Sequence, residues 1–363
     1  MNSGFIEGND LIVDGHLDLS MNAIDWNRDL RMPVSEIRKL ESGMTDFPDR
    51  GNNVVSFDEM KKGRIGLCFA TLIARYAKPD HPLGGWRSPE QAWAQTSAQL
   101  SWYQEMERQN YLTSIRNISD LNNHLGILQS DISNSTLGYL LTLEGADSIV
   151  TFDHLYLRHE EGLRAIGPAH YGPGTYAYGT DSEGSIGAKG RELLQKMDEL
   201  DMILDVTHLC DTSFWEALEV FKGPVWASHS NCRSLVNHNR QFSDDQIKVL
   251  IQRDAVIGMP LDAWMMVPNW QRAVSHPSNT DVTLSHMIDH MDHICSIAGN
   301  ANYIALGTDL DGGFGKEQCP SDIETIADLQ EVPALLSARG YTREDIKGIM
   351  HQNWINKLSA SLK

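Results

Sequence analysis

The sequence predicts an α/β fold, a (β/α)8 barrel of the TIM type, on three observations. The chain has 363 residues, and barrels of this class form one domain at such lengths. Eight short apolar runs recur along it, with amphipathic stretches between many of them, which is typical of a parallel sheet with helical crossovers. Polar residues stand at the carboxyl ends of several runs. Closure into a barrel would bring all of these ends to one mouth.

Each of the eight apolar runs is predicted to be a strand. They cover residues 10–19, 66–75, 138–147, 163–170, 202–209, 224–230, 255–262 and 303–312. Helices are predicted over residues 89–110, 191–201, 212–221, 243–254, 283–299 and 323–340. An open, doubly wound sheet is the alternative arrangement. We favour the barrel because an open sheet would spread the polar strand ends along an edge, whereas closure gathers them.

The chain is predicted to form a single domain over residues 1–363, because no linker or shift in composition divides it. Inserted loops and a helix are expected near residues 47–56 and 76–110, and the second of these opens with a stretch rich in Pro and Gly. A closing helix is predicted over residues 342–361. Its start is indicated by Thr342, which stands three residues before Asp345 as in a helix-capping signal.

Composition and charge exclude several classes of protein. Hydrophobic residues make up 41% and charged residues 22%, as in globular rather than disordered chains. The net charge of −19 repels phosphate backbones, so nucleic acid is not an expected partner. No apolar run has the length of a membrane span, and the start, MNSGFIEGND, lacks the features of a signal peptide. Five cysteines without a CxxC pair indicate reduced thiols, so we expect a cytoplasmic protein with no membrane partner.

The polar residues at the strand ends are the candidate functional residues. In VDGHLDL, His16 and Asp18 are two apart, so they are predicted to share one face of the strand, with Asp14 one layer deeper on the same face. The other runs end in Glu144, His170, His208, His229, and the pair Asp309 and Asp311.

Imidazole and carboxylate side chains are the ligands that zinc and similar first-row ions prefer. One open catalytic site takes three or four protein ligands, and this chain offers a larger set: His16, Asp18, Glu144, His208 and His229. The set suits two divalent ions, most simply zinc, with one carboxylate between them. Two such ions about 3.5–4 Å apart make a hydroxide available at neutral pH and hold a substrate oxygen.

Other residues of metal-binding or catalytic type are assigned structural roles. His286, His290 and His293 lie on one helical stripe, but the Glu of an HExxH motif is missing, so they are predicted to be surface residues. Cys210 and Cys232 are expected to be buried, inert thiols. Trp26 and Trp264 are candidates to line the pocket. No GxSxG motif is present, which disfavours a serine hydrolase.

Several motifs resemble those of the membrane (renal) dipeptidase family, peptidase family M19, within the amidohydrolase superfamily. They are DGHLDL, TLEGAD, IGPAHYGPG, DVTHLCD, ASHSNC followed by NHNRQFSDDQI, and GTDLDGG. They occur in the order typical of the family from residue 14 to residue 313. The chain is most similar to the soluble bacterial members. It departs from the family pattern in the closing helix, where MHQNW replaces the frequent GGNW.

The resemblance implies a role for each candidate residue. One zinc would be bound by His16 and Asp18, the second by His208 and His229, and both by Glu144. His170 would contact the scissile carbonyl and stabilise the tetrahedral intermediate. Arg240 would hold the terminal carboxylate of the substrate, and Asp309 would be the catalytic acid–base group. From the residues alone Asp311 is an alternative to Asp309.

The expected function is therefore hydrolysis of dipeptides, including L-Xaa-D-Xaa dipeptides, by attack of hydroxide held at a two-zinc centre. A possible homodimer is implied by the resemblance alone. Two other functions stay open: deacylation of an N-acyl-amino acid or a related amidohydrolase reaction at the same site, and an inactive metal-binding scaffold.

Overall fold

The computed structural model describes residues 11–77, 84–132, 135–272 and 274–363. The N-terminal segment MNSGFIEGND and part of the insertion expected near 76–110 lie outside these ranges.

The strands form two parallel sheets. In the first, β1 (Ile12–Leu17), β2 (Ile65–Ile73), β4 (Leu137–Glu144), β5 (Leu163–Gly167), β6 (Ile203–Asp205) and β7 (Val225–Trp226) are hydrogen-bonded in this order, and β3 (Leu112–Ser114) pairs with β4. In the second, β8 (Ile257–Met259) pairs with β9 (Ile304–Leu306). All eight predicted runs contain a strand. The three-residue strand β3 was not predicted, because so short a segment has no recognisable periodicity.

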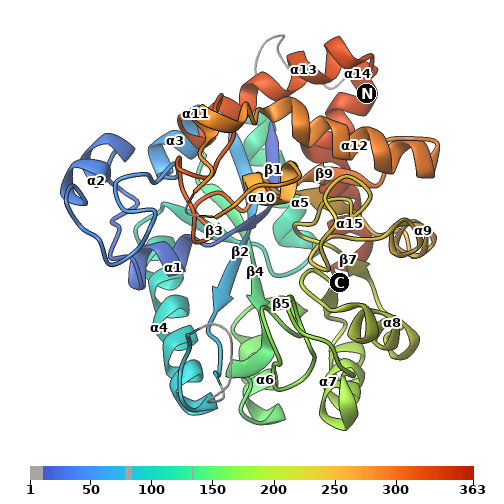
Figure 1. Ribbon diagram of the computed structural model, residues 1–363. Helices are drawn as coiled ribbons and strands as arrows, with labels where there is room; N and C mark the ends of the chain where they lie inside the picture. The colour runs from blue at the N-terminus through green and yellow to red at the C-terminus, as the bar shows by residue number, and fades with distance from the viewer. Residues whose placement is uncertain (1–10, 78–83, 133–134, 273) are drawn as a thin grey trace.

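The helices lie around the outside of the central strands (Figure 1). They are α1 (Leu19–Ile24), α2 (Val34–Leu40), α3 (Phe57–Lys62), α4 (Pro89–Arg108), α5 (Ile118–Asp131), α6 (Phe152–Glu160), α7 (Gly187–Glu199), α8 (Asp211–Val220), α9 (Asp244–Gln252), α10 (Ala263–Met266), α11 (Pro277–Thr280), α12 (Leu284–Ala298), α13 (Val332–Arg339), α14 (Arg343–Lys347) and α15 (Asn353–Ser361). The predicted closing helix is α14 and α15 joined by a π-helical segment, Gly348–Gln352, and Thr342 caps its start as expected. Within the described ranges, none of the helices combines the length and apolar character needed to cross a bilayer.

Two contacts connect the sheets at their edges. Ala227, just after β7, forms a parallel bridge with Ile257 of β8. At the opposite edge, the buried carboxylate of Asp14 on β1 accepts hydrogen bonds from the backbone N–H of Thr308 at 2.8 Å and from its hydroxyl at 2.5 Å. The predicted α/β class with a parallel sheet is confirmed.

Two apolar clusters pack on opposite faces of the strands. An inner cluster takes a residue from nearly every strand: Val13, Phe69, Leu140, Ala165, Ile203, Trp226 and Ala305. The alternate residues of β2, Cys68, Ala70 and Leu72, belong to a larger outer cluster between the strands and the helices. Trp354 of α15 closes the inner cluster, donating from its indole N–H to the carbonyl of Leu306 at 2.7 Å.

One prediction about β1 is wrong. Because Asp14 and His16 are two residues apart, they were predicted to lie on the same face of the strand. In the register between β1 and β2, however, Asp14 pairs with Cys68 and Leu17 pairs with Ala70. Three residues of β1 therefore match two residues of β2, so β1 contains an extra residue. This bulge puts Leu17 rather than His16 on the face of Asp14 and turns His16 to the other side.

His290 corrects the assignment of the stripe of histidines on α12 to the surface. It is fully buried, whereas His286 and His293 are half-buried. Its Nδ1 accepts from the backbone N–H of Cys232 at 3.0 Å, and its Nε2 lies 3.1 Å from the carbonyl of Met266. The ring therefore connects α12 to the loop after β7 and to α10. Cys232 is buried beside it, as expected.

Two glycines allow a close approach of neighbouring strands. A Cβ built on Gly258 or on Gly307 would lie 1.9 Å from the carbonyl oxygen of Ser228. Because backbone atoms cannot move aside as a flexible side chain can, no larger residue fits at either position without displacing a strand.

We predict that Gly307→Ala and Gly126→Ala change stability in opposite directions. The first introduces a backbone clash and should lower the free energy of unfolding by about 1–3 kcal/mol or more. The second lies in α5 with nothing within 4 Å of the added Cβ, so alanine should stabilise the helix by about 0.5–1 kcal/mol. Denaturant unfolding of both variants measures this. A Gly307→Ala protein as stable as the parent would contradict the packing described.

We also predict a pH-dependent loss of stability through His290. Burial lowers the pKa of His290 from 6.5 to about 4, so between these values the unfolded chain binds a proton that the folded chain excludes. Lowering the pH from 7 to 5 should therefore cost about 2 kcal/mol at this residue. His290→Gln should make the pH dependence of the unfolding free energy shallower by that amount, whatever its stability at pH 7. Parallel curves for parent and variant would refute the prediction.

Candidate metal centre

Five side chains predicted as metal ligands lie together at the carboxyl ends of the strands. His16 is the penultimate residue of β1, Asp18 precedes α1, Glu144 ends β4, and His208 and His229 follow β6 and β7. All five are buried. Two groups with ligand atoms within 4.8 Å of one another contain them, the first being His16, Asp18 and Glu144 and the second Glu144, His208 and His229.

Glu144 presents one carboxylate oxygen to each group. Its Oε2 lies 3.6 Å from Nε2 of His16, which is itself 3.6 Å from Oδ2 of Asp18. Its Oε1 lies 3.0 Å from Nε2 of His208 and 3.4 Å from Nε2 of His229. A carboxylate with one oxygen in each of two ligand groups has the arrangement of a bridging ligand.

The unpaired polar atoms of the centre fit a divalent ion. Nε2 of His16, Oδ1 of Asp18 and Oε1 of Glu144 are buried without a hydrogen-bond partner among the described residues. Such atoms are rare in folded proteins, because each costs the free energy of desolvation without compensation. Nitrogen and carboxylate oxygen donors in these numbers are a suitable ligand set for zinc and related ions.

Hydroxyl groups orient the two histidines of the second group. Nδ1 of His208 lies 2.9 Å from Oγ1 of Thr180, and Nδ1 of His229 lies 2.8 Å from Oγ of Ser228. Because the far nitrogen of each ring is held by a hydroxyl, Nε2 of each ring faces the centre. Partners of this kind are usual behind metal-binding histidines.

The electrostatic environment favours the ligand forms of His208, His229 and Glu144. Burial, reinforced by nearby positive charge, lowers the pKa of His208 and of His229 well below the usual range, so both rings are neutral. Burial opposes ionisation of Glu144, but its interactions with His170, His16 and His208 hold its pKa well below the usual value. A neutral imidazole and an ionised carboxylate are the forms that bind metal.

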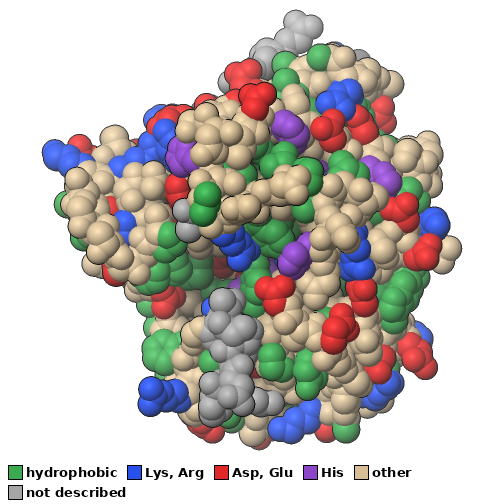
Figure 2. Space-filling model, viewed as in Figure 1, with side chains coloured by type: hydrophobic (Ala, Val, Ile, Leu, Met, Phe, Trp, Pro, Cys, Tyr) green, Lys and Arg blue, Asp and Glu red, His purple; other side chains and the backbone are tan. Residues whose placement is uncertain are grey.

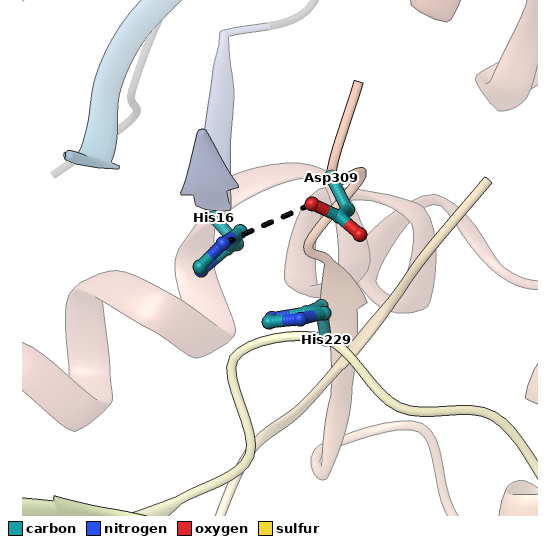
Figure 3. Close-up of side chains that lie close together, drawn as sticks. All are labelled: His16, His229 and Asp309. Carbon is teal, nitrogen blue, oxygen red and sulfur yellow. Dashed lines mark ion pairs between the residues drawn. The ribbon is translucent and has the colours of Figure 1, made fainter. Parts of the chain in front are cut away.

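The two candidate acid–base residues, Asp309 and Asp311, lie in different surroundings. Oδ1 of Asp309 lies 3.8 Å from Nε2 of His16, and the side chains of His16, His229 and Asp309 point toward one another (Figure 3). Asp311 points away from the cavity, accepting from the backbone N–H groups of Val54 and Val55, each at 2.8 Å. Asp311 thereby anchors the predicted insertion near 47–56.

The backbone at the centre is unusual. His208 has a φ of 70° and Asp309 a φ of 57°, the left-handed region that residues with a Cβ seldom adopt. Each costs about 1 kcal/mol or more and persists only where the surrounding packing requires it. His208 and Asp309 both line the cavity described below.

A cavity of about 730 Å³ opens above the metal-ligand groups. Figure 2 shows a hollow near the centre of the viewed face, with apolar side chains inside and basic and histidine side chains at its edges. The cavity is lined by Asp18, Glu144, His170, His208, His229, Arg240 and Asp309 among the predicted residues. Trp26 also lines it as expected, whereas Trp264 is not among its lining residues.

His170 and Arg240 lie beside the metal-ligand groups. Nε2 of His170 is 4.0 Å from Oε1 of Glu144. Burial lowers the pKa of His170 to about 3, so its ring is neutral. Arg240 is buried and donates to Oγ of Ser230 at 2.7 Å and to the carbonyl of His229 at 2.8 Å. No carboxylate in the described parts of the chain forms an ion pair with Arg240.

Sequence analysis missed several lining residues with polar side chains, among them Arg75, Tyr171, Asp262 and Arg272. A signal existed for the first three, because Arg75 ends the second apolar run, Tyr171 follows His170, and Asp262 ends the seventh run. Arg75 donates from Nη1 to Nδ1 of His170. Arg272 lies in a loop without periodicity, and nothing in its local sequence marks it.

Comparison with known proteins identifies the family. The family model of the membrane dipeptidases (peptidase family M19) matches residues 6–360. An uncharacterised dipeptidase of Schizosaccharomyces pombe is 22% identical to the chain over 94% of this chain and 78% of that protein. The dipeptidase aclJ of Aspergillus oryzae is 23% identical over 96% of this chain and 77% of that protein.

Solved structures share the fold over nearly their whole length. The crystal structure of dipeptidase AC, a metallopeptidase, matches with a TM-score of 0.79 at 21% identity, over 98% of this chain and 99% of that chain. A metallopeptidase from Rhodobacter sphaeroides, liganded with a phosphinate mimic of the dipeptide L-Ala-D-Ala, matches with a TM-score of 0.78 at 20% identity, over 97% and 99% of the two chains.

The family match spans almost the entire sequence, and relatives and structural neighbours alike include named dipeptidases. The enzyme class predicted from the sequence, a metal-dependent dipeptidase, is confirmed on this basis. The chain belongs to the membrane dipeptidase family, peptidase family M19.

Proposed function

We propose that the protein is a two-zinc dipeptidase that hydrolyses dipeptides, including those of the L-Xaa-D-Xaa type. The observation that carries the proposal is the position of Glu144, whose two carboxylate oxygens each face a separate pair of ligands. A single ion would leave one of these pairs without a cation. Divalent ions bound there supply a Lewis acid for the amide carbonyl and make water a nucleophile at neutral pH.

His170 is suited to stabilise the oxyanion that develops during attack. A guanidinium can only donate hydrogen bonds, so Nδ1 of His170 accepts from Arg75 and the ring proton lies on Nε2. Nε2 is the atom that faces the metal-ligand groups. A fixed N–H directed at the developing negative charge contributes transition-state stabilisation without reorganisation.

Asp309 is suited to move the proton of the reaction. Its carboxylate lines the cavity beside His16, and burial raises its pKa well above the usual value. A carboxylate of raised basicity can take a proton from the attacking water and return it to the nitrogen of the leaving amine. Cleavage of an amide requires both proton transfers, and Asp309 is placed to make both of them.

Arg240 is suited to bind the substrate's terminal carboxylate. Its buried guanidinium has two N–H groups held by Ser230 and the carbonyl of His229, and its planar shape permits paired hydrogen bonds to a carboxylate. A carboxylate held so near the reacting atoms restricts substrates to dipeptides. The phosphinate mimic of L-Ala-D-Ala on the Rhodobacter sphaeroides relative supports a D residue at the second position.

We infer further that the strands close into one eight-stranded barrel within a single domain of residues 1–363. The bridge between Ala227 and Ile257 and the hydrogen bonds from Thr308 to Asp14 support closure at the two edges. The shared inner cluster, to which nearly every strand contributes, supports the same arrangement.

We predict that Glu144→Ala loses its bound metal. Because Glu144 is common to both ligand groups, its removal should reduce the metal content from two ions to less than one per chain, measured by elemental analysis after gel filtration. Glu317→Ala is the matched control. Glu317 lines the same cavity but lies in neither group, and its carboxylate accepts from the backbone N–H of Gly315 at 3.0 Å. Full metal content in Glu144→Ala would argue against the proposed centre.

We predict that Asp309→Asn keeps its metal and loses turnover. Without a proton-transferring carboxylate, kcat on an L-D dipeptide should fall by about 100-fold or more. Asp311→Asn is the control, because an amide oxygen can still accept from Val54 and Val55, and its kcat should stay within a few-fold of the parent. The same assay should include an N-acyl-amino acid, which distinguishes a deacylase from a dipeptidase. Full activity in Asp309→Asn would show that another group transfers the proton.

A further inference from the structure

The cavity contains guanidinium groups that are not paired with acids. Arg75, Arg240 and Arg272 all line it, and none of them forms an ion pair within the described ranges. A buried arginine elsewhere in the chain behaves differently, since Arg28 is bonded to Glu41 at 2.8 Å. In a chain with a net charge of −19, three unpaired arginines in one cavity indicate a ligand that brings its own negative charges.

Among the described residues, the acidic residues of the outer cavity form no ion pair with these arginines. Asp262 accepts from the indole N–H of Trp264 at 2.5 Å and from Nε2 of Gln318 at 2.7 Å. Glu317 accepts from the backbone N–H of Gly315 at 3.0 Å. Both carboxylates accept from neutral donors, and the charge of Asp262 also acts on Arg272 without an ion pair between them. The remaining acids of the cavity lie among candidate metal ligands, Asp18 and Glu144 in the two groups described above and Asp309 in a third group with His16 and His229.

Arg272 is held in place although it lies at the exposed rim. Its guanidinium lies over the ring of Trp264, 4.5 Å from the centroid, and its Nη2 donates to the hydroxyl of Tyr171 at 2.9 Å. Trp264 is fixed in turn by its bond to Asp262. An arginine stacked in this way has lost most of its rotational freedom before a ligand arrives, and its free N–H groups keep the geometry that binds a carboxylate.

Arg272 and Arg240 lie on the same side of the cavity. Nδ1 of His238 accepts from the backbone N–H of Arg240 at 3.1 Å, and the ring of His238 lies 4.9 Å from the ring of Trp264, over which Arg272 is stacked. The guanidinium of Arg75 already donates two hydrogen bonds within the protein. One goes to Nδ1 of His170 and the other, at 3.3 Å, to the carbonyl of Gly84.

We propose that Arg272 binds a second carboxylate, on the side chain of the substrate's C-terminal residue, so that the preferred substrates are dipeptides ending in an acidic amino acid. The inference rests on the proposed function, in which Arg240 holds the main-chain carboxylate of that same residue. Two arginines on one side of the cavity would then bind the two carboxylates of one leaving group.

The test compares acidic dipeptides with their amide isosteres. The zinc-loaded full-length enzyme is assayed on Ala-Asp against Ala-Asn and on Ala-Glu against Ala-Gln, each with an L and with a D second residue. Because a hydrogen bond to a charged group is lost with the amide, kcat/KM should be about tenfold or more higher for the acidic member, chiefly through KM.

Variants in the loop that contains Arg272 test whether this residue causes the preference for acidic substrates. Arg272→Gln should bring the ratio of acidic to amide substrate close to one, and Arg272→Lys should keep part of it. Gln271→Ala, a change at the adjacent exposed position, should keep the parental ratio. A parental ratio near one, or a ratio unchanged in Arg272→Gln, would overturn the inference while leaving a dipeptidase. Failure to hydrolyse any of the eight dipeptides would instead reject the proposed function on which it rests.

Discussion

The burial of Glu144 among three histidines and an aspartate is the constraint on which the rest of the site depends. Ionisable groups removed from water cost free energy unless opposite charges or hydrogen bonds compensate them. Here three of the polar atoms have no such partner among the described residues. The protein therefore carries, at the carboxyl ends of its strands, a cluster that positive charge would stabilise, and the surrounding structure keeps the cluster from relaxing.

The scaffold supplies that rigidity. The inner cluster of apolar side chains lies beneath the centre, with the stacked rings of Phe69 and Trp226 closed off by Trp354. Close packing of this kind resists displacement, and it can hold His208 and Asp309 in left-handed backbone conformations that are unfavourable in isolation.

Charge is distributed unevenly between the floor and the walls of the cavity. The floor holds carboxylates and neutral imidazoles, which suit cations, whereas Arg75, Arg240 and Arg272 stand around it. An acidic protein surface would by itself repel small anions. The arginines reverse that repulsion locally, and a substrate with its carboxylate at one end and its amide bond near the floor matches both regions.

Local sequence determined the positions of the eight main strands, because an apolar run and the polar residue that ends it are neighbours along the chain. The same local pattern marked His16, Asp18, Glu144, His208 and His229 as one set of candidate ligands. It misplaced Asp14, because the bulge in β1 exists only in its pairing with β2. It missed the burial of His290, which depends on the loops that cover α12.

The family resemblance favoured Asp309 over Asp311, and the tertiary structure shows where the two carboxylates lie. The two residues look equivalent in the sequence, but Val54 and Val55 take the second carboxylate away from the cavity. Arg272 likewise acquires its place only through Trp264 and Tyr171. The periodicity of a sequence indicates which face of its own strand or helix a side chain occupies. Which side chains it meets depends on contacts between segments far apart in the chain, and these form only on folding.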